Sequence, residues 1–251
     1  MTDVEWHRNR ARAESFGAGA ADYDRYRPPY ADGLFDDLAS RRPDRVLDIG
    51  CGNGRAAVGL IARGLDVLGV EPDTRMAEVA RSRGVVVEIA PFEDWDDDGR
   101  RFDLLTCGSA WHWVEPARGV AKAAAVLRPG GTLARFWNYH VLDDATVERL
   151  ERVYADLGVE AGGHGRGARA YDSDPVVADP AFGEVTTEIW REARTFTADG
   201  WIDLLGTFSD HATLDPDRRT ELFAALRREI DAMGGTLRAT ACTHLLRSTR
   251  V

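Results

Sequence analysis

The chain has 251 residues, of which 44% are hydrophobic and 29% are charged, and its formal net charge is -10. This composition is typical of a globular protein with a substantial core, and the acidic balance disfavours a phosphate backbone, so we expect no nucleic-acid partner. No apolar run reaches the roughly 18 to 20 residues that a membrane-spanning helix needs, which predicts no membrane partner.

Cysteine and histidine positions give a second set of exclusions. The three cysteines lie far apart and form no CxxC pair, which is typical of a reducing compartment. The six histidines show no HExxH or similar ligand spacing, so we expect no metal site. The segment 1–12 is polar and charged, unlike a secretory signal, so we expect a cytoplasmic protein. The sequence leaves the oligomeric state open.

Residues 45–138 alternate between short apolar runs and stretches with helical spacing. The predicted strands cover 46–49, 66–70, 85–89, 102–106 and 132–137, and the predicted helices cover 56–63, 73–83 and 116–127. Strands that alternate with helices of this length predict a parallel sheet with helices on both faces.

Beyond residue 138 this alternation ends. The predicted elements are helices over 144–157, 198–208 and 216–233 and strands over 184–191 and 236–249. There is no internal repeat and no linker long enough to divide the chain, so we expect one domain. The additional helices are predicted to cover the carboxyl ends of the strands, where open α/β sheets bind ligands.

A glycine turn follows the first predicted strand, in the segment Asp48-Ile49-Gly50-Cys51-Gly52-Asn53-Gly54. Glycines allow positive φ and let a ligand approach the backbone closely. A dinucleotide-binding GxGxxG turn would place its third glycine at position 55, where this chain has Arg55. The carboxylate of Asp48, directly before the turn, would repel a pyrophosphate and attract a cationic ligand.

A second acidic residue, Glu71, ends the next predicted strand about 20 residues on, where a carboxylate can bind both ribose hydroxyls. S-adenosylmethionine carries an ammonium, a sulfonium and a ribose, and therefore suits both acids. The sequence thus predicts S-adenosyl-L-methionine as cofactor. The alternative is a structural turn with an exposed acid beside it.

With these features, residues 46–138 resemble the core of the class I S-adenosylmethionine-dependent methyltransferases, and in particular the type 11 group that includes trans-aconitate methyltransferase. The resemblance implies an α/β fold, a doubly wound, seven-stranded, mostly parallel sheet whose last strand is antiparallel, with a helical cap and a small-molecule substrate. The implied parts of the single domain are a lid (1–40), a cofactor-binding core (41–138), cap insertions (139–183 and 194–235) and the last two strands (184–193 and 236–249).

The same resemblance implies the cofactor contacts. Asp48, Gly50 and Gly52 would line the methionine part, and Glu71 would hold the ribose. The other implied contacts are Pro72, Met76, Phe92 and Glu93 at the adenine, Ser109 and Ala110 after the fourth strand, and Tyr26, together with Tyr23, in the lid.

Methyl transfer is an in-line displacement, for which the protein orients the acceptor and excludes water. His112 is predicted as the base or orienting group, because an unperturbed pKa of about 6.5 suits proton transfer. Alternatively, His112 only shapes its loop, and a carboxylate acceptor would need no base. The predicted substrate contacts are Trp111, Tyr139, Ser209 and His211, whereas Trp113 and Trp137 are interpreted as packing residues.

Two other classes of protein stay open at this point. A nicotinamide- or flavin-dependent oxidoreductase would share a glycine turn, although Asp48 and Arg55 argue against it. A protein that binds S-adenosylmethionine without transferring its methyl group would have the same cofactor residues, so the sequence does not separate it from a methyltransferase.

Overall fold

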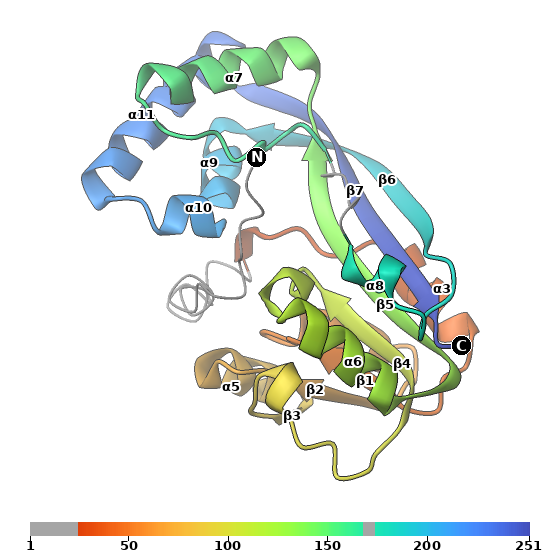
Figure 1. Ribbon diagram of the computed structural model, residues 1–251. Coiled ribbons are helices and arrows are strands. Elements are labelled where there is room, and N and C mark those ends of the chain that lie inside the picture. The colour runs from red at the N-terminus through yellow and green to blue at the C-terminus, as the bar shows by residue number, and fades with distance from the viewer. Residues whose placement is uncertain (1–24, 168–173) are drawn as a thin grey trace.

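One seven-stranded sheet runs through the molecule (Figure 1). The computed structural model describes residues 25–167 and 174–251. The strands are β1 (Val46–Ile49), β2 (Val67–Val70), β3 (Val86–Glu88), β4 (Phe102–Gly108), β5 (Leu127–Val141), β6 (Thr186–Thr197) and β7 (Thr236–Thr249). Their order is β3-β2-β1-β4-β5-β7-β6; β1 to β5 pair in parallel, and β7 is antiparallel to both β5 and β6. The predicted doubly wound sheet with an antiparallel last strand is confirmed.

Helices cover both faces of the parallel half. The helices on one face are α3 (Asp32–Ser40), α4 (Arg55–Ile61) and α5 (Thr74–Ser82), and on the other α6 (Pro116–Val126) and α8 (Pro175–Ala178), with the 3-10 turns η2 (Phe92–Asp94) and η3 (Trp111–Trp113). Side chains alternate along a strand, so β1 sends Val46 into the first core and Leu47 and Ile49 into the second. These two cores fix the carboxyl ends of β1, β2 and β4.

A second group of helices packs at the far end of the long strands (Figure 1). These helices, called the cap below, are α7 (Asp144–Asp156), α9 (Ala198–Gly206), α10 (Ser209–Ala212) and α11 (Pro216–Ala232). Leu150, Leu205 and Leu226 are among the buried residues of their core, which is separate from the two cores beside the parallel strands. None of the helices in the described ranges combines the length and apolar character that a membrane crossing requires.

Strands β5 and β6 are longer than the sequence predicted. The predicted strands ended at residues 137 and 191, whereas β5 continues to Val141 and β6 to Thr197. The reason is β7, which pairs with β5 as far as Val141↔Thr240 and with β6 as far as Thr197↔Thr236. Residues 139–141 and 194–197, expected in the cap, therefore belong to the sheet.

Candidate active site

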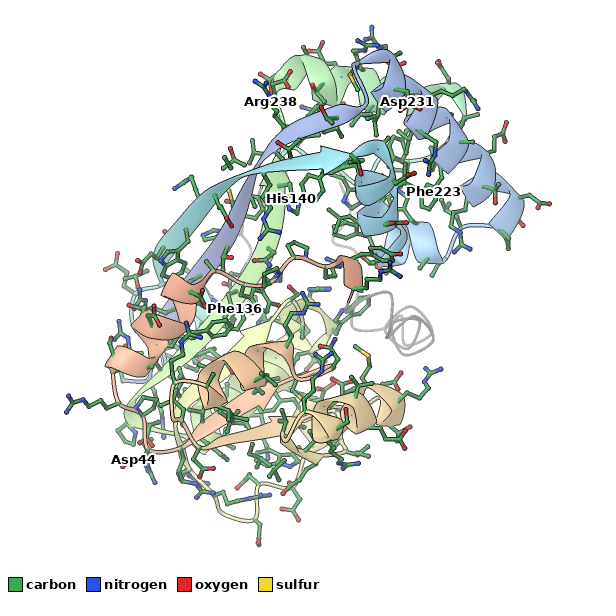
Figure 2. The ribbon with its side chains drawn as sticks, turned by 180° about the vertical axis from the view of Figure 1, so that it is seen from behind. Asp44, Phe136, His140, Phe223, Asp231 and Arg238 are labelled. Atoms are coloured by element: carbon green, nitrogen blue, oxygen red, sulfur yellow. The ribbon has the colours of Figure 1, made fainter. Side chains whose placement is uncertain are left out.

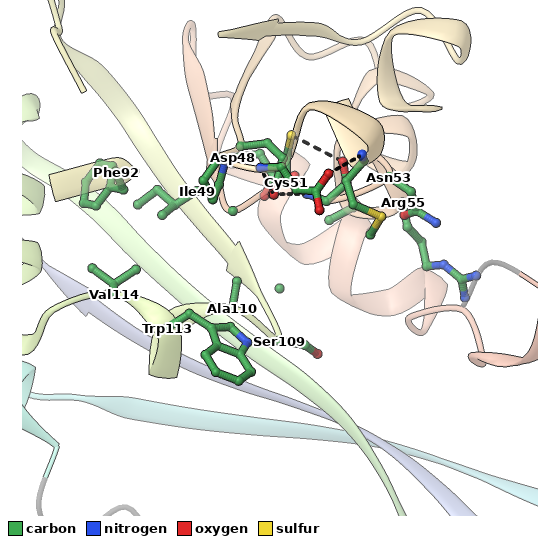
Figure 3. Close-up of a pocket in the computed structure, with 18 of the residues that line it drawn as sticks. Asp48, Ile49, Cys51, Asn53, Arg55, Phe92, Ser109, Ala110, Trp113 and Val114 are labelled. Atoms are coloured by element: carbon green, nitrogen blue, oxygen red, sulfur yellow. Dashed lines mark hydrogen bonds between the residues drawn. The ribbon is translucent and has the colours of Figure 1, made fainter. Parts of the chain in front are cut away.

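A cleft opens at the carboxyl ends of β1, β2 and β4, and it encloses about 1190 Å³ of empty space, part of it open to solvent (Figure 3). The loops that follow parallel strands all lie at the same edge of the sheet, and for this reason residues distant in sequence lie together here. The predicted cofactor residues that line the cleft are Asp48, Gly50, Gly52, Glu71, Pro72, Met76, Phe92, Glu93, Ser109 and Ala110.

The glycine turn forms one wall of the cleft. Gly50, Gly52 and Gly54 have φ values of 59°, 54° and 80°, the left-handed region that favours glycine. A Cβ atom on Gly50 would lie 2.7 Å from the Cβ of Ala110. The turn can thus approach the opposite wall only with glycine at this position.

Asp48 lies at the base of the cleft with 1% of its surface exposed. The Thr106 hydroxyl donates a hydrogen bond to Asp48 Oδ1 at 2.7 Å, but Asp48 Oδ2 has no hydrogen-bond partner among the described residues. Burial raises the pKa of Asp48 to about 7, although the bond from Thr106 acts in the opposite direction. A buried oxygen of this kind is costly unless a ligand completes its hydrogen bonding.

Glu71 connects the glycine turn to the start of α5. Its Oε2 accepts a hydrogen bond from the Gly52 backbone N–H at 2.9 Å, and its Oε1 accepts one from Asp73 N–H at 3.0 Å. Burial raises the pKa of Glu71, while these two backbone bonds lower it. Each carboxylate oxygen has two lone pairs, so both oxygens keep one acceptor position for a ligand hydroxyl.

The wall opposite the glycine turn is apolar. Phe92, Ala110, Trp113 and Val114 line it, and Figure 3 shows Trp113 and Val114 across the cleft from Cys51. Trp113, which the sequence predicts to be a packing residue, lines the cleft instead. The short η3 turn orients Trp113 toward the cleft, and no sequence spacing indicates that direction.

The tyrosine that reaches the cleft is Tyr30. Tyr26, the predicted lid contact, is absent from the lining, and its ring lies 5.3 Å from the Arg25 guanidinium carbon. Tyr30 lines the cleft, with its hydroxyl 3.2 Å from Ser109 Oγ. Tyr23 lies outside the described residues.

The segment 27–31, called the strap below, is fastened to the long strands. The Asn138 amide donates hydrogen bonds to the carbonyls of Pro28 and Pro29 at 3.0 and 2.9 Å. The Thr243 hydroxyl accepts one from Ala31 N–H at 3.0 Å and donates one to Asn138 Oδ1 at 2.7 Å. These bonds hold Tyr30 between the cleft at the carboxyl ends of the parallel strands and the cap.

His112 and Trp111 lie outside the cleft lining. His112 is exposed, and its ring centroid lies 4.7 Å from that of Trp113. Trp111 is 7% exposed in the core beside α6, where the Arg135 guanidinium carbon lies 5.6 Å from its ring. The structure therefore gives η3 one cleft residue, Trp113, instead of the predicted pair.

The other predicted substrate contacts are also away from the cleft. Tyr139 lines a neighbouring hollow with Arg191 and Cys242. Ser209 begins α10, and His211 is 2% exposed in the cap core, with its Nε2 2.8 Å from the Tyr154 hydroxyl. His211 is therefore turned into the cap core and is not among the residues that line the cleft, and its contact with the substrate stays a prediction.

The cap also contains a polar trio that sequence spacing does not reveal. Asp210 Oδ2 lies 2.7 Å from His164 Nε2, and Asp210 Oδ1 lies 2.9 Å from His211 Nδ1. Atoms of the three residues that could bind a metal ion lie within 4.8 Å of one another. Burial raises the pKa of Asp210, yet its bonds to the two histidines hold it well below the usual range. In this arrangement each oxygen of the Asp210 carboxylate is hydrogen-bonded to one of the two imidazoles.

Comparisons with known proteins agree with this geometry. Residues 46–131 match the methyltransferase domain family. An uncharacterized methyltransferase of Mycobacterium tuberculosis is 33% identical over 220 residues, which cover 85% of this chain and 84% of that protein. These matches favour methyl transfer over the oxidoreductase alternative.

Solved structures show the same fold. A protein from Anaeromyxobacter dehalogenans, described as a candidate type II methyltransferase, has a TM-score of 0.66 at 24% identity, over 88% of this chain and 97% of that one. Haemonchus contortus phosphoethanolamine N-methyltransferase 2, solved with S-adenosylhomocysteine, has a TM-score of 0.54 at 14% identity, over 98% of this chain and 60% of that one. The similarity to known methyltransferases extends over most of this chain, and the fold agrees with it. This chain therefore belongs to the class I S-adenosylmethionine-dependent methyltransferases, enzymes that use S-adenosyl-L-methionine as methyl donor.

Proposed function

We propose that the cleft holds S-adenosylmethionine and that the enzyme passes its methyl group to a small molecule bound between the cleft and the cap. The observation that carries this proposal is the buried, unpartnered Oδ2 of Asp48 at the base of the cleft. A cationic group placed there would complete the hydrogen bonding of the carboxylate and stabilise its charged form. The methionine ammonium is such a group.

The other cleft residues suit the rest of the cofactor. The free acceptor positions of Glu71 face the same cleft as Asp48 and would receive the ribose hydroxyls. Pro72, Met76 and Phe92 would contact the adenine. The bound cofactor supplies an electrophilic methyl group, and the chain supplies position, a dry environment and a place for the acceptor. The finer resemblance to the trans-aconitate methyltransferase group stays a prediction.

Titration calorimetry of the purified protein tests the cofactor site. We expect micromolar binding of S-adenosylmethionine and S-adenosylhomocysteine and no binding of NAD. The matched variants are Asp48→Asn, at the base of the cleft, and Glu78→Gln, on the exposed face of α5. Weakened binding is expected for the first only. Equal affinity in both variants would remove Asp48 from the proposed site.

Methyl transfer itself is tested by the formation of S-adenosylhomocysteine in the presence of candidate acceptors. Small carboxylates, phenols and amines cover the main acceptor classes. We expect product to accumulate with acceptors of one class and not in their absence. Tight cofactor binding with no product from any class would instead favour the remaining alternative, a protein that binds the cofactor without transferring its methyl group.

A further inference from the structure

A glycine-rich loop, residues 158–167, follows α7 and packs against α10 in the cap. Glycine occupies five of its ten positions, and none of its residues lines the cofactor cleft. A Cβ atom on Gly162 would collide with Asp210 Oδ2 and with His164 Nε2. The loop backbone can therefore approach these two polar groups only because position 162 is glycine.

The polar trio of His164, Asp210 and His211 lies where this loop meets α10. The nitrogens of the two imidazoles that face Asp210 are 2.7 and 2.9 Å from its oxygens, which are hydrogen-bond distances. Around a zinc ion, ligand atoms about 2.0 to 2.2 Å from the metal lie about 3 to 3.5 Å apart. The three donors are thus gathered at nearly the spacing of a metal site, and an ion would take the place of the shared protons.

The His211 ring is held for this purpose from behind. Its Nε2 lies 2.8 Å from the Tyr154 hydroxyl, and its ring centroid lies 5.7 Å from that of Phe223, which Figure 2 labels inside the cap. A metal-bound histidine usually donates its second N–H to a fixed partner, which sets the orientation of the ring. A tyrosine hydroxyl can accept such a bond, so Nδ1 of His211 is free to bind an ion.

The open side of the trio faces solvent. The side chains of His164 and Asp210 are 16% and 29% exposed, whereas that of His211 is 2% exposed. An ion can therefore enter from this side, and a water molecule can complete its coordination. The Phe208 ring, with its centroid 4.3 Å from that of His164, supports the imidazole on the loop.

We propose that His164, Asp210 and His211 bind a divalent transition metal ion, with zinc as the best match. Two imidazole nitrogens, one carboxylate oxygen and a water form a known zinc donor set, and imidazole ligands favour such ions over Mg²⁺ and Ca²⁺. Each imidazole would bind through the nitrogen that now faces Asp210, and its remaining proton would lie on the other ring nitrogen. The ion would fasten the glycine-rich loop to α10.

This proposal differs from the expectation drawn from the sequence, which is of no metal site. The histidine spacing could not indicate the trio, because His164 and Asp210 are 46 positions apart and meet only through the fold of the cap. The proposal does not depend on the identity of the cofactor or of the methyl acceptor.

Titration calorimetry of the full chain, after dialysis against a chelator, tests the site with zinc chloride. We expect one equivalent of Zn²⁺ to bind with micromolar or tighter affinity, and neither Mg²⁺ nor Ca²⁺ to bind. Zn²⁺ should also raise the unfolding temperature, because it binds the folded state. Co²⁺, as a spectroscopic probe, should give the visible absorption of a site with few ligands, and Zn²⁺ should displace it.

Graded variants identify the ligands. Tyr154→Phe removes only the hydrogen bond behind His211 and should weaken Zn²⁺ binding by about 10- to 100-fold. His164→Ala and Asp210→Asn each remove a ligand and should weaken it further. His112→Ala, an exposed histidine outside the trio, is the matched control and should bind Zn²⁺ as the unmodified protein does. Circular dichroism checks that all four variants are folded.

Two results would overturn the metal site. One is the absence of Zn²⁺ binding by the unmodified protein. The other is Zn²⁺ binding that His164→Ala and Asp210→Asn leave unchanged, because the ion would then belong to other donors. Neither result bears on the proposed function, which depends on binding of S-adenosylhomocysteine in the cleft.

Discussion

At the scale of single residues, the site depends on carboxylates that folding has removed from water. Asp48 is the clearest case, since one of its oxygens is bonded to Thr106 and the other is unpaired. An ionised carboxylate in this position destabilises the empty protein and attracts a cationic ligand. The same atom therefore reduces stability and supports binding, a combination common at functional sites.

The variant Asp48→Asn separates these two effects. Because the amide carries no charge, we expect the empty variant to unfold at a higher temperature at pH 8, while its affinity for S-adenosylmethionine falls by about tenfold or more. Differential scanning fluorimetry and titration calorimetry measure the two quantities. A lower unfolding temperature together with unchanged affinity would show that Asp48 serves packing alone.

The raised pKa of Asp48 also predicts a pH dependence. Between the unfolded pKa of 3.8 and the folded value of about 7, the empty folded protein holds the proton more tightly, so this residue's contribution to stability decreases as pH rises through that window. Binding of the ammonium needs the ionised form, so affinity for S-adenosylhomocysteine should increase with pH up to about 7 and then level off. Calorimetry from pH 5.5 to 8 checks this, and Asp48→Asn should remove the slope.

Glu71 offers a test of the ribose contact. Glu71→Ala removes the acceptors for two hydroxyls, each charge-assisted hydrogen bond being worth about 1.5 to 3 kcal/mol, and should weaken cofactor binding strongly. Glu78→Ala, on the exposed face of α5, is the matched control and should bind as before. Calorimetry with S-adenosylhomocysteine compares them. Equal affinities would rule out the ribose assignment.

Whether the place of a residue could be predicted depends on the sequence separation between that residue and the residues it contacts. Gly50, Gly52 and Glu71 could be predicted because a strand, a turn and the next strand place them together locally. Tyr30 and His140 reach their positions through the strap and through β5, which depend on contacts with residues more than 60 positions away. No local pattern records such contacts, and the same is true of the pairing of His164 with Asp210.

At the scale of elements, a buried ion pair joins the short helix α8 to the sheet. Arg135 on β5 donates a hydrogen bond to Asp174 Oδ1 at 2.6 Å, and their side chains are 1% and 3% exposed. Asp174 also accepts a hydrogen bond from Val176 N–H at 3.0 Å and so begins α8. One carboxylate thus caps a helix and neutralises a buried cation.

Removing that charge should be costly. Asp174→Asn leaves the Arg135 guanidinium buried without its counter-charge, for which we expect a loss of about 3 to 5 kcal/mol in the free energy of unfolding. Glu151→Gln breaks the more exposed pair with Arg166 and should cost about 0 to 1 kcal/mol. Urea unfolding measures both. Similar small losses in the two variants would mean that the buried pair contributes nothing beyond a surface pair.

The element boundaries show where sequence patterns stop being informative. Helices α5, α7 and α11 were predicted within two residues of their observed ends, because Asp73, Asp143 and Asp215 precede them as caps. Strands β5 and β6 were predicted too short, because their last residues mix polar with apolar side chains and stay extended by pairing with β7. Cross-strand pairing of this kind leaves no periodicity in a single strand.

At the scale of the whole molecule, the cap has a hydrophobic core of its own, and the long strands connect it to the cofactor side. Leu226 of α11 is fully buried in that core, far from the cleft lining. A substitution that leaves a cavity in this core should destabilise the cap without changing the cleft, because the cleft is built from the turns after β1, β2 and β4.

Leu226→Ala tests this independence. We expect a loss of about 2 to 5 kcal/mol in stability from the cavity left behind, with affinity for S-adenosylhomocysteine nearly unchanged. Hydrogen exchange should increase in α7, α9 and α11 and stay constant around the glycine turn. Glu221→Ala, exposed on the same helix, is the control. A large loss of cofactor affinity in Leu226→Ala would show that the two cores are coupled.

The way the chain enters and leaves the cap has a consequence for how this fold can diversify. Val141 on β5 is paired with Thr240 on β7, and Thr197 on β6 is paired with Thr236 on β7. At each point where the chain passes from the sheet into the cap or back, the strand is therefore hydrogen-bonded to a neighbouring strand. A different set of helices grafted between these points would meet the same fixed strand ends. If the acceptor binds beside the cap, as proposed, exchanging these helices would change the surroundings of the acceptor and leave the proposed methyl-donor site unaltered.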